Sequence, residues 1–204
     1  MATRTLDAEL LTGPQLYRRV VLEKLTGARE SVLIATANVK AMLVEVDGGF
    51  RPIADVFARL AARGVSIRLL HAELPSRPFR AAFDRKKSLA RAMELKICPR
   101  VHFKAVLVDG AWLYLGSANL TGAGLGAKHD DARNFELGLV TEDFETIDRV
   151  SSLFEAVWGG SECTRCRHFD TCPDPIGEGP KKRSSRRGRQ AGVTLGRPRR
   201  LRRD

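Results

Sequence analysis

The stretch VHFKAVLVDGAWLYLGSAN, residues 101–119, decides how the rest of this chain is interpreted. His102 and Lys104 are two residues apart in an apolar run, so the alternation of a strand places both side chains on one face. Asp109-Gly110 separates two strand-like runs and is a strong signal for a two-residue loop, because the favoured turn requires positive φ. The stretch therefore predicts a β-hairpin.

The register of this hairpin predicts which polar side chains meet. With a two-residue loop, the residues that flank the loop pair with each other, and His102 lies opposite Ser117. Lys104 and Asn119 then lie two residues to either side, about 7–8 Å away along the diagonals. A histidine, a lysine, a hydroxyl and an amide would converge on a space the size of a phosphate. The alternative is a core hairpin with polar residues at frayed ends, but the complete spacing favours phosphate chemistry.

This spacing resembles the HxK(x)4D(x)6GSxN signature of the phospholipase D superfamily. The matching residues are His102, Lys104, Asp109, Gly116, Ser117 and Asn119. The resemblance extends more loosely from about Pro14 to Trp158. The superfamily includes phospholipases, lipid synthases, nucleases and DNA-repair phosphodiesterases, so the resemblance implies phosphodiester chemistry without specifying the substrate.

The resemblance also implies a mechanism. In the superfamily, one histidine attacks phosphorus and forms a phosphohistidine, while a second histidine protonates the leaving oxygen and later activates water. Lysines and asparagines bind the non-bridging oxygens and stabilise the charge of the transition state, so catalysis requires no cofactor. We expect the catalytic residues to include His102, Lys104, Ser117 and Asn119.

The chain contains only one copy of this motif. None of the other histidines, His71, His129 and His168, is followed by lysine at the required spacing. Small bacterial nucleases of the superfamily are homodimers with the site on the two-fold axis. The resemblance therefore implies a homodimer in which two copies of His102 face one phosphate. His71 ends an apolar run, and we expect its role to be structural.

Three further polar residues are candidates for the site. Glu136 matches the acidic residue that follows the motif in the superfamily, which implies that it accepts a hydrogen bond from the far nitrogen of His102. The alternative is an exposed carboxylate on a strand. Asp109 belongs to the motif, but as the first residue of an Asp-Gly turn it is predicted to be needed chiefly for conformation. Asn134 is a weaker candidate to line the site.

The order of the elements predicts an α/β fold, a phospholipase D-like α/β sandwich with a mixed β-sheet flanked by helices. Besides the hairpin, we expect strands at 31–39, 65–71, 96–98 and 134–140. We expect helices at 14–28, 53–63, 79–95 and 144–158. Residues 40–50 fit no single element, although Gly48-Gly49 marks a turn. The catalytic domain would cover residues 1–159.

Charge is concentrated at the C-terminal end of the 204 residues. Residues 181–204 contain eleven Lys and Arg and one Asp, whereas the first 180 residues contain 24 basic and 23 acidic residues. We expect residues 177–204 to be a disordered basic tail. Such a tail binds nucleic acid by releasing counterions, although anionic lipid attracts it similarly and a tail without function is the alternative.

Neither a membrane span nor a secretion signal is expected. No apolar run approaches the ~18 residues that a spanning helix needs. The first residues, MATRTLDAELL, include acids and lack an apolar signal core. The chain is therefore predicted to be a cytoplasmic protein.

The cysteines form a second pattern, which predicts a metal-binding segment at residues 160–176. Clustered cysteines in a cytoplasmic protein favour metal over disulfides. A distant cysteine followed by C-x2-C-x5-C resembles the [4Fe–4S] ligand set of RecB-type exonucleases, including CRISPR-associated ones. Zinc, with His168 in place of the first cysteine, and unligated thiols remain alternatives. The four residues are Cys98, Cys163, Cys166 and Cys172.

Three functions fit these patterns. A metal-independent nuclease acting on DNA or RNA is favoured by the single motif, the basic tail and the nuclease-like cysteine pattern. The segment SANLTGAG resembles the corresponding segment of helicase-associated and defence-system members of the superfamily, which suggests a partner of that kind. Lipid-acting members typically carry two motif copies. A non-catalytic nucleic-acid-binding module is disfavoured by the intact His102, Lys104 and Asn119.

Overall fold

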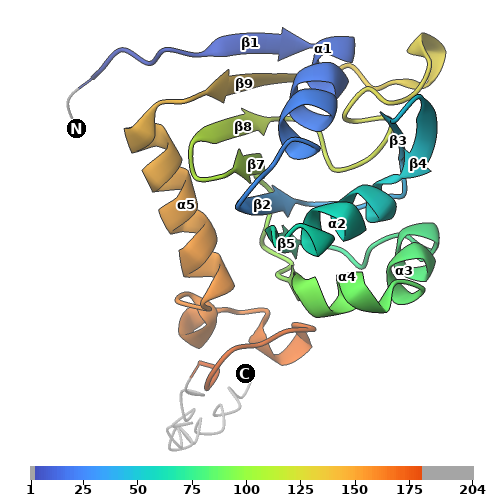
Figure 1. The fold of residues 1–204 in the computed structure, drawn as a ribbon. Helices are drawn as coiled ribbons and strands as arrows, with labels where there is room; N and C mark the ends of the chain where they lie inside the picture. Colours follow the sequence, from blue (N-terminus) through green and yellow to red (C-terminus); the bar gives the residue numbers. More distant parts are fainter. Residues whose placement is uncertain (1–2, 181–204) are drawn as a thin grey trace, which may run out of the picture.

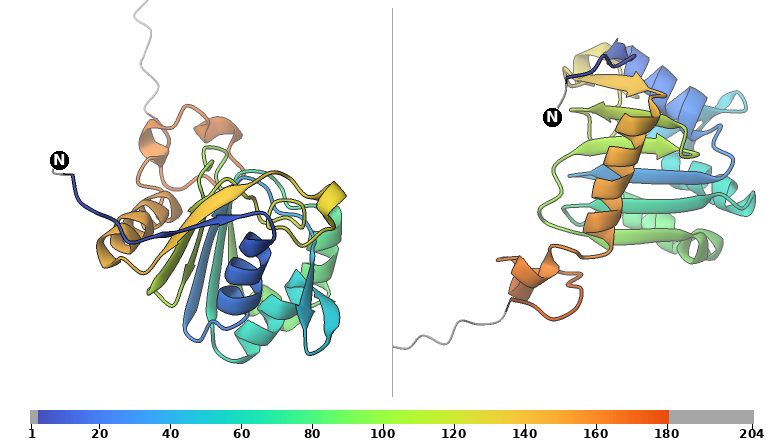
Figure 2. Two further views of the ribbon diagram at one scale, coloured as in Figure 1. Left: turned by 90° about the horizontal axis from the view of Figure 1, so that it is seen from above. Right: turned by 90° about the vertical axis from the view of Figure 1, so that its left-hand side faces the viewer.

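The computed structural model describes residues 3–180 (Figure 1). Most of the expected basic tail, residues 181–204, lies outside the described residues. The described part is a mixed β-sheet with helices on both faces (Figures 1 and 2). The predicted α/β sandwich with a mixed sheet is therefore confirmed.

The main sheet contains seven strands in the order β1-β9-β8-β7-β2-β5-β6. β2, β5 and β6 run parallel, whereas β7, β8, β9 and β1 each pair antiparallel with their neighbours. The strands are β1 (Glu9–Thr12), β2 (Ser31–Thr36), β5 (Ser66–His71), β6 (Met93–Ile97), β7 (Lys104–Val108), β8 (Trp112–Gly116) and β9 (Leu137–Thr141). The hairpin of the motif thus joins the parallel half of the sheet to its antiparallel half.

Several short helices cover one face of the sheet, and a single long helix covers the other (Figure 2). The first group consists of α1 (Pro14–Leu16), which continues as the π-helix η1 (Tyr17–Leu25), with α2 (Ile53–Ala62), α3 (Arg77–Asp84) and α4 (Lys87–Ala92). The long helix is α5 (Phe144–Trp158), whose Ile147 and Phe154 are buried against β7 and β8 residues. None of the helices in residues 3–180 has the length and apolar character needed to cross a bilayer.

The expected single helix at 79–95 is wrong in two respects: it is divided into α3 and α4, and its last three residues belong to β6. The chain turns between α3 and α4, and the strand β6 begins at Met93 instead of near residue 96. Met93 is buried and pairs with Ile67 of β5, so pairing at the sheet edge overrides the helical pattern there.

Two strand regions went unrecognised in the sequence. The ambiguous residues 40–50 contribute to a separate hairpin of β3 (Leu43–Val46) and β4 (Gly49–Pro52), with positive φ at Asp47 and Gly48 in its turn. β1 was not predicted, since only Leu11 of its residues is buried.

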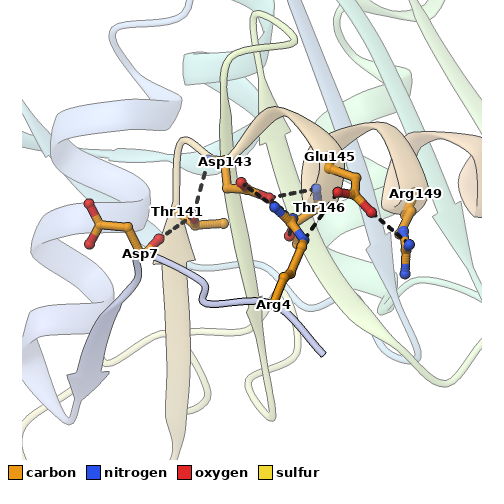
Figure 3. A network of polar contacts seen from close by, with 7 residues as sticks. All are labelled: Arg4, Asp7, Thr141, Asp143, Glu145, Thr146 and Arg149. Atoms are coloured by element: carbon orange, nitrogen blue, oxygen red, sulfur yellow. Dashed lines mark hydrogen bonds and ion pairs between the residues drawn. The ribbon is translucent and has the colours of Figure 1, made fainter. Parts of the chain in front are cut away.

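The start of the chain is tied to the end of β9 and the start of α5 (Figure 3). The Thr141 hydroxyl donates to the Asp7 carbonyl (2.6 Å), and the Arg4 guanidinium bonds the Asp143 carboxylate. That carboxylate also caps α5 by accepting from the Thr146 backbone N–H (2.8 Å). The Arg4 hydrogen bond holds the pKa of Asp143 well below its ordinary value. These contacts hold the edge strand β1 against the sheet.

The Asp109-Gly110 turn forms between β7 and β8, but the loop is three residues long instead of the predicted two, so the register differs by one residue. Asp109 and Gly110 both have positive φ, at 54° and 63°, and the Ala111 N–H donates to the Val108 carbonyl (3.1 Å). Ala111 then stays outside the ladder, so Val108 pairs with Trp112 instead of Ala111. Both faces of this hairpin are apolar, and burial could not distinguish the two registers in the sequence.

The Asp109 side chain holds the turn to the start of β2. Its carboxylate accepts hydrogen bonds from the backbone N–H groups of Arg29 (3.0 Å), Glu30 (2.8 Å) and Ser31 (3.0 Å). Partial burial raises the pKa of Asp109, but these backbone hydrogen bonds outweigh it, and the pKa lies below its ordinary value. The contacts agree with a conformational role for Asp109.

We expect Asp109→Ala to lower the free energy of unfolding by about 2 kcal/mol, because three backbone donors lose a charged acceptor. Asp109→Asn should cost less, since asparagine tolerates positive φ and keeps one acceptor oxygen. The folded-state pKa is lowered, so the stabilisation by the carboxylate is present above the unfolded pKa of about 3.9 and is lost as pH falls through the folded pKa. Urea unfolding at several pH values measures both effects. A gap between wild type and Asp109→Asn that does not shrink as the pH falls below the unfolded pKa would contradict this assignment.

Candidate active site

The motif residues gather at one edge of the sheet. β7 is antiparallel to both β2 and β8, so its start lies beside the ends of those two strands. β9 starts beside the end of β8, where Gly138 pairs with Gly116. Four chain segments therefore meet at this edge, and each carries polar residues.

His102 and Lys104 lie where the chain approaches and starts β7. His102 is exposed and precedes the strand, whereas Lys104 is its first residue and is half-buried. The Lys104 Nζ donates to the His102 carbonyl (2.8 Å), which holds the lysine beside the histidine. Within residues 3–180 the His102 ring takes part in no hydrogen bond. An exposed imidazole next to an ammonium group suits attack on an anion.

Asn119 is fixed by the end of β2. Its Oδ1 accepts from the Thr36 hydroxyl (3.1 Å) and from the backbone N–H groups of Ala37 (3.1 Å) and Asn38 (3.2 Å). Backbone N–H groups can only donate, so these bonds identify the amide oxygen. The NH₂ group forms no hydrogen bond to a described residue. Asn119 therefore keeps a pre-oriented donor that can bind an oxyanion.

Ser117, Glu136 and Asn134 form a hydrogen-bonded group beside the strand ends. The Ser117 hydroxyl donates to one Glu136 carboxylate oxygen and accepts from the Leu137 N–H (3.2 Å). The Asn134 Nδ2 donates to the other Glu136 oxygen (3.1 Å). Glu136 thus has partners, but the His102 ring is not one of them in this structure. Its orienting role toward His102 stays a prediction.

Because the register differs from the predicted one, the side chains of His102 and Ser117 do not face each other as expected. Lys104 pairs with Gly116, so regular alternation along β8 would put Ser117 on the face opposite to Lys104. The chain leaves β8 at Gly116, and Ser117 is held instead by Glu136 and Leu137. The direct opposition of His102 and Ser117 is therefore wrong, although both lie at the same end of the hairpin.

Tyr114, which lies outside the predicted set, supports this edge together with two glycines. Tyr114 is buried, and its hydroxyl accepts from the Ala118 N–H (3.3 Å). Burial raises the pKa of Tyr114 to about 12, so the phenol stays protonated. A Cβ added at Gly116 would lie 2.3 Å from this hydroxyl, and one at Gly138 would lie 2.2 Å from the ring. The glycines facing each other across β8 and β9 are the sequence signal that a large side chain passes between them.

His71 has the expected structural environment. It is buried, and its Nδ1 lies 2.7 Å from the Glu73 carbonyl. Burial lowers the pKa of His71, which favours the neutral ring with its Nδ1 proton donated to that carbonyl.

The four cysteines come together where the chain directly after β6 meets the C-terminal segment. They line one pocket with His168 and Asp174. Burial raises the pKa of the Cys98 thiol, and the other three cysteines raise it further. Among the described residues, no group of three or more His, Cys, Asp or Glu side chains is arranged so that it could hold a metal ion. The residues are Cys98, Cys163, Cys166 and Cys172.

A mixed sheet with His-x-Lys at the start of a central strand and Ser-x-Asn at the end of the next defines a phosphodiesterase class. The family model described as "Cardiolipin synthase, PLD-like domain" matches residues 21–158, which is more than half of the chain. The chain therefore belongs to the phospholipase D superfamily of phosphodiesterases, and the predicted resemblance is confirmed. A search of curated proteins found no match.

Solved structures share this fold at low sequence identity. NucT from Helicobacter pylori is 20% identical with a TM-score of 0.53, over 74% of this chain and 95% of that chain. The phospholipase D family member Nuc from Salmonella typhimurium is 19% identical with a TM-score of 0.54, over the same shares. TrmBL2, an archaeal chromatin protein with a novel mode of DNA binding, is 15% identical with a TM-score of 0.51, over 78% of this chain and 54% of that chain.

Because the two ends of the Asn119 amide have different roles, one substitution can test its role in binding separately from its role in stability. Asn119→Asp keeps the acceptor oxygen for Ala37 and Asn38 but replaces the free donor with a negatively charged oxygen. We expect unfolding free energy within about 1 kcal/mol of wild type and phosphodiesterase activity reduced about 100-fold or more. Asn119→Ala should lose both stability and activity. Full activity in a folded Asn119→Asp protein, measured with a chromogenic phosphodiester, would contradict the donor role.

Proposed function

We propose that this protein is a metal-independent nuclease that cleaves DNA or RNA through a phosphohistidine, at a site shared by two copies of the chain. The observation that carries this proposal is the incomplete site. One exposed imidazole, one ammonium group and one oriented amide lie at a sheet edge, and the chain has no second His-x-Lys. The two-step chemistry of the superfamily requires two histidines, and a two-fold axis supplies the second.

The proposed reaction proceeds in two displacements. In the first, a neutral His102 nitrogen attacks phosphorus, the bond from phosphorus to the leaving oxygen breaks, and His102 of the second copy donates a proton to that oxygen. In the second, the same second-copy imidazole takes a proton from water, the water oxygen attacks phosphorus, and the phosphorus–nitrogen bond breaks. The phosphate product leaves, and both histidines return to their starting protonation states.

Two pairs of side chains stabilise the charge in this scheme. Lys104 and Asn119 of each copy bind the non-bridging oxygens, which gain charge as the transition state forms. Glu136 orients and stabilises the imidazolium of His102. Its carboxylate is already bonded by Ser117 and Asn134, and its oxygens retain lone pairs for a further donor. No metal ion takes part in these steps.

An uncovered apolar surface next to the site supports the dimer. α5 leaves bare the part of its sheet face formed by β1 and β9, where Leu10 is 58%, Leu137 56% and Leu139 41% exposed. Leu10 pairs with Leu139, so these side chains form one row. Phe135, two residues before β9, is also fully exposed. Leu137 bonds Ser117 through its backbone, so the patch is continuous with the half-site, and a second copy is the proposed occupant.

Nucleic acid is preferred over lipid as the substrate. In the superfamily that this chain resembles, small members with a single motif are nucleases. This chain covers 95% of Nuc and of NucT, so those structures too are little more than one such domain. The name of the family model, cardiolipin synthase, keeps a lipid phosphodiesterase as the alternative. A non-catalytic DNA-binding module is a third candidate, supported by the fold shared with TrmBL2. The basic tail would bind nucleic acid in either case, and a helicase or defence-system partner would deliver it.

The cysteines have no part in this chemistry. The proposal gives them a structural role, in holding a [4Fe–4S] cluster or a zinc ion near the catalytic edge.

The nuclease proposal predicts cleavage of DNA or RNA in the presence of EDTA, with a rate that falls about 1,000-fold or more in His102→Ala. Single-stranded DNA, duplex DNA, RNA and phosphatidylcholine are given to the same preparation. The matched control is His129→Ala, which removes an exposed histidine outside the site and should cleave at the wild-type rate. Cleavage of phosphatidylcholine alone would favour the lipid enzyme. Binding of nucleic acid without His102-dependent cleavage would favour the module.

The shared site predicts that inactive subunits poison active ones. When wild-type and His102→Ala chains are mixed in equal amounts and allowed to exchange, about a quarter of the dimers contain two wild-type chains, so about a quarter of the activity of an all-wild-type sample should remain. Independent monomers would keep about half of that activity. Leu139→Lys should shift the protein to monomers in light scattering and abolish activity, while Leu74→Lys, at an exposed leucine outside the patch, should do neither. A fully active monomer would overturn the dimer.

A further inference from the structure

The strongest feature that the proposed chemistry leaves unused is the C-terminal segment of residues 159–180. It contains two short turns, the 3₁₀ helices η3 (Cys163–Arg165) and η4 (Phe169–Thr171), and neither has a buried residue. Within residues 159–180, Gly160 alone is buried. A segment of this size without a hydrophobic core usually depends on a cross-link or a metal for its conformation.

The cysteines occupy equivalent places in these turns. The Cys166 N–H donates to the Cys163 carbonyl (3.0 Å), and the Cys172 N–H donates to the Phe169 carbonyl (3.2 Å), so each turn ends at a cysteine. Cys98 comes from a different part of the chain, immediately after β6, where its N–H donates to the His71 carbonyl (2.8 Å). All four thiols are half-buried, unpaired with each other, and line the same pocket.

The surroundings of this pocket suit a negatively charged centre. Four thiolates around Zn²⁺, or around a [4Fe–4S]²⁺ core, carry a net charge of about −2. Lys96 and Arg100 line the pocket and offer positive charge. Asp174 also lines it, but its Oδ2 accepts from the Ile97 N–H (2.7 Å), which ties the segment to β6. The Lys96 ammonium bonds the Trp158 carbonyl at the end of α5.

From this arrangement we infer that Cys98, Cys163, Cys166 and Cys172 together hold one thiolate-ligated metal centre that fastens the C-terminal segment to the end of β6. The centre is a zinc ion or an iron–sulfur cluster, since both accept four cysteine thiolates. Binding requires the thiols to lose their protons and to close inward on the metal, because the described side chains are not yet in ligand positions. His168 lines the same pocket, and the inferred ligand set is the four cysteines without it.

The centre would act on the catalytic edge through the connection from β6 to β7. Cys98 precedes His102 by four residues, and the Val101 N–H donates to the Cys98 carbonyl (2.9 Å). A neighbouring pocket of about 230 Å³ is lined by Cys98, Cys163 and Phe103, so the cysteine segment reaches the residue between His102 and Lys104. Fixing Cys98 therefore fixes the path that presents His102. This inference does not depend on the proposed nuclease activity.

The test is the metal content of the full-length protein purified without oxygen. Wild type should contain either one zinc per chain and be colourless, or about four iron and four sulfide ions with a broad absorbance near 400 nm. Cys98→Ser and Cys163→Ser should each lose most of the metal, whereas His168→Ala and Thr164→Ala should retain it. Circular dichroism checks that the sheet is intact in each variant. Removing the metal should also expose residues 160–176 to limited proteolysis while leaving the sheet domain resistant.

Three results would overturn the inference. The first is a protein that holds no metal as purified and takes up none from zinc or from iron and sulfide. The second is metal retained in both Cys98→Ser and Cys163→Ser. The third is a disulfide between any two of the four cysteines in the anaerobically purified protein, detected by mass spectrometry without reduction.

Discussion

The central strand β2 is held at both ends by side chains from the β7–β8 hairpin, and the active edge depends on this double clamp. At the start of β2, the Asp109 carboxylate accepts from three consecutive backbone N–H groups, including that of Ser31. At its end, the Asn119 amide oxygen accepts from the Ala37 and Asn38 N–H groups. The backbone N–H groups at both ends of β2 are donors that have no ladder partner. The aspartate and the asparagine of the motif thus set the position of β7 against β2.

This clamp connects folding to chemistry. With β7 fixed so that Ala105 pairs with Ala35, Lys104 must lie beside the end of β2, where Asn119 is held. Asn119 uses its oxygen for the backbone and keeps its NH₂ group for a ligand, so one side chain serves both purposes. Tyr114 also helps to position Asn119, since its buried hydroxyl accepts a hydrogen bond from the N–H of the preceding residue, Ala118. Such pre-organised donors stabilise developing charge without rearranging during the reaction.

The sequence predicted what local chemistry determines and missed what long-range pairing determines. The Asp-Gly turn requires positive φ, and both residues have it. The register depended on whether Ala111 joined the ladder, and two apolar faces gave no preference. Likewise, the apolar periodicity of α4 continues to Met93, and only the pairing with β5 places that residue in a strand. The grouping of the cysteines could be proposed from spacing, but their common pocket depends on where β6 ends relative to α5.

The way the helices are distributed over the two sheet faces leaves the leucine row bare beside the motif residues. Several helices cover one face of the sheet, but α5 alone covers the other, which leaves β1 and β9 open beside the half-site. A monomer would keep an isolated cationic edge and a solvated apolar strip, and burying that strip on a membrane or an unrelated protein would not supply a second histidine. A two-fold contact across β9 would cover the leucines and bring two copies of His102 toward each other. The hydrogen bonds between Leu137 and Ser117 join the leucine row to the motif residues, so a partner that covers the row would border the site.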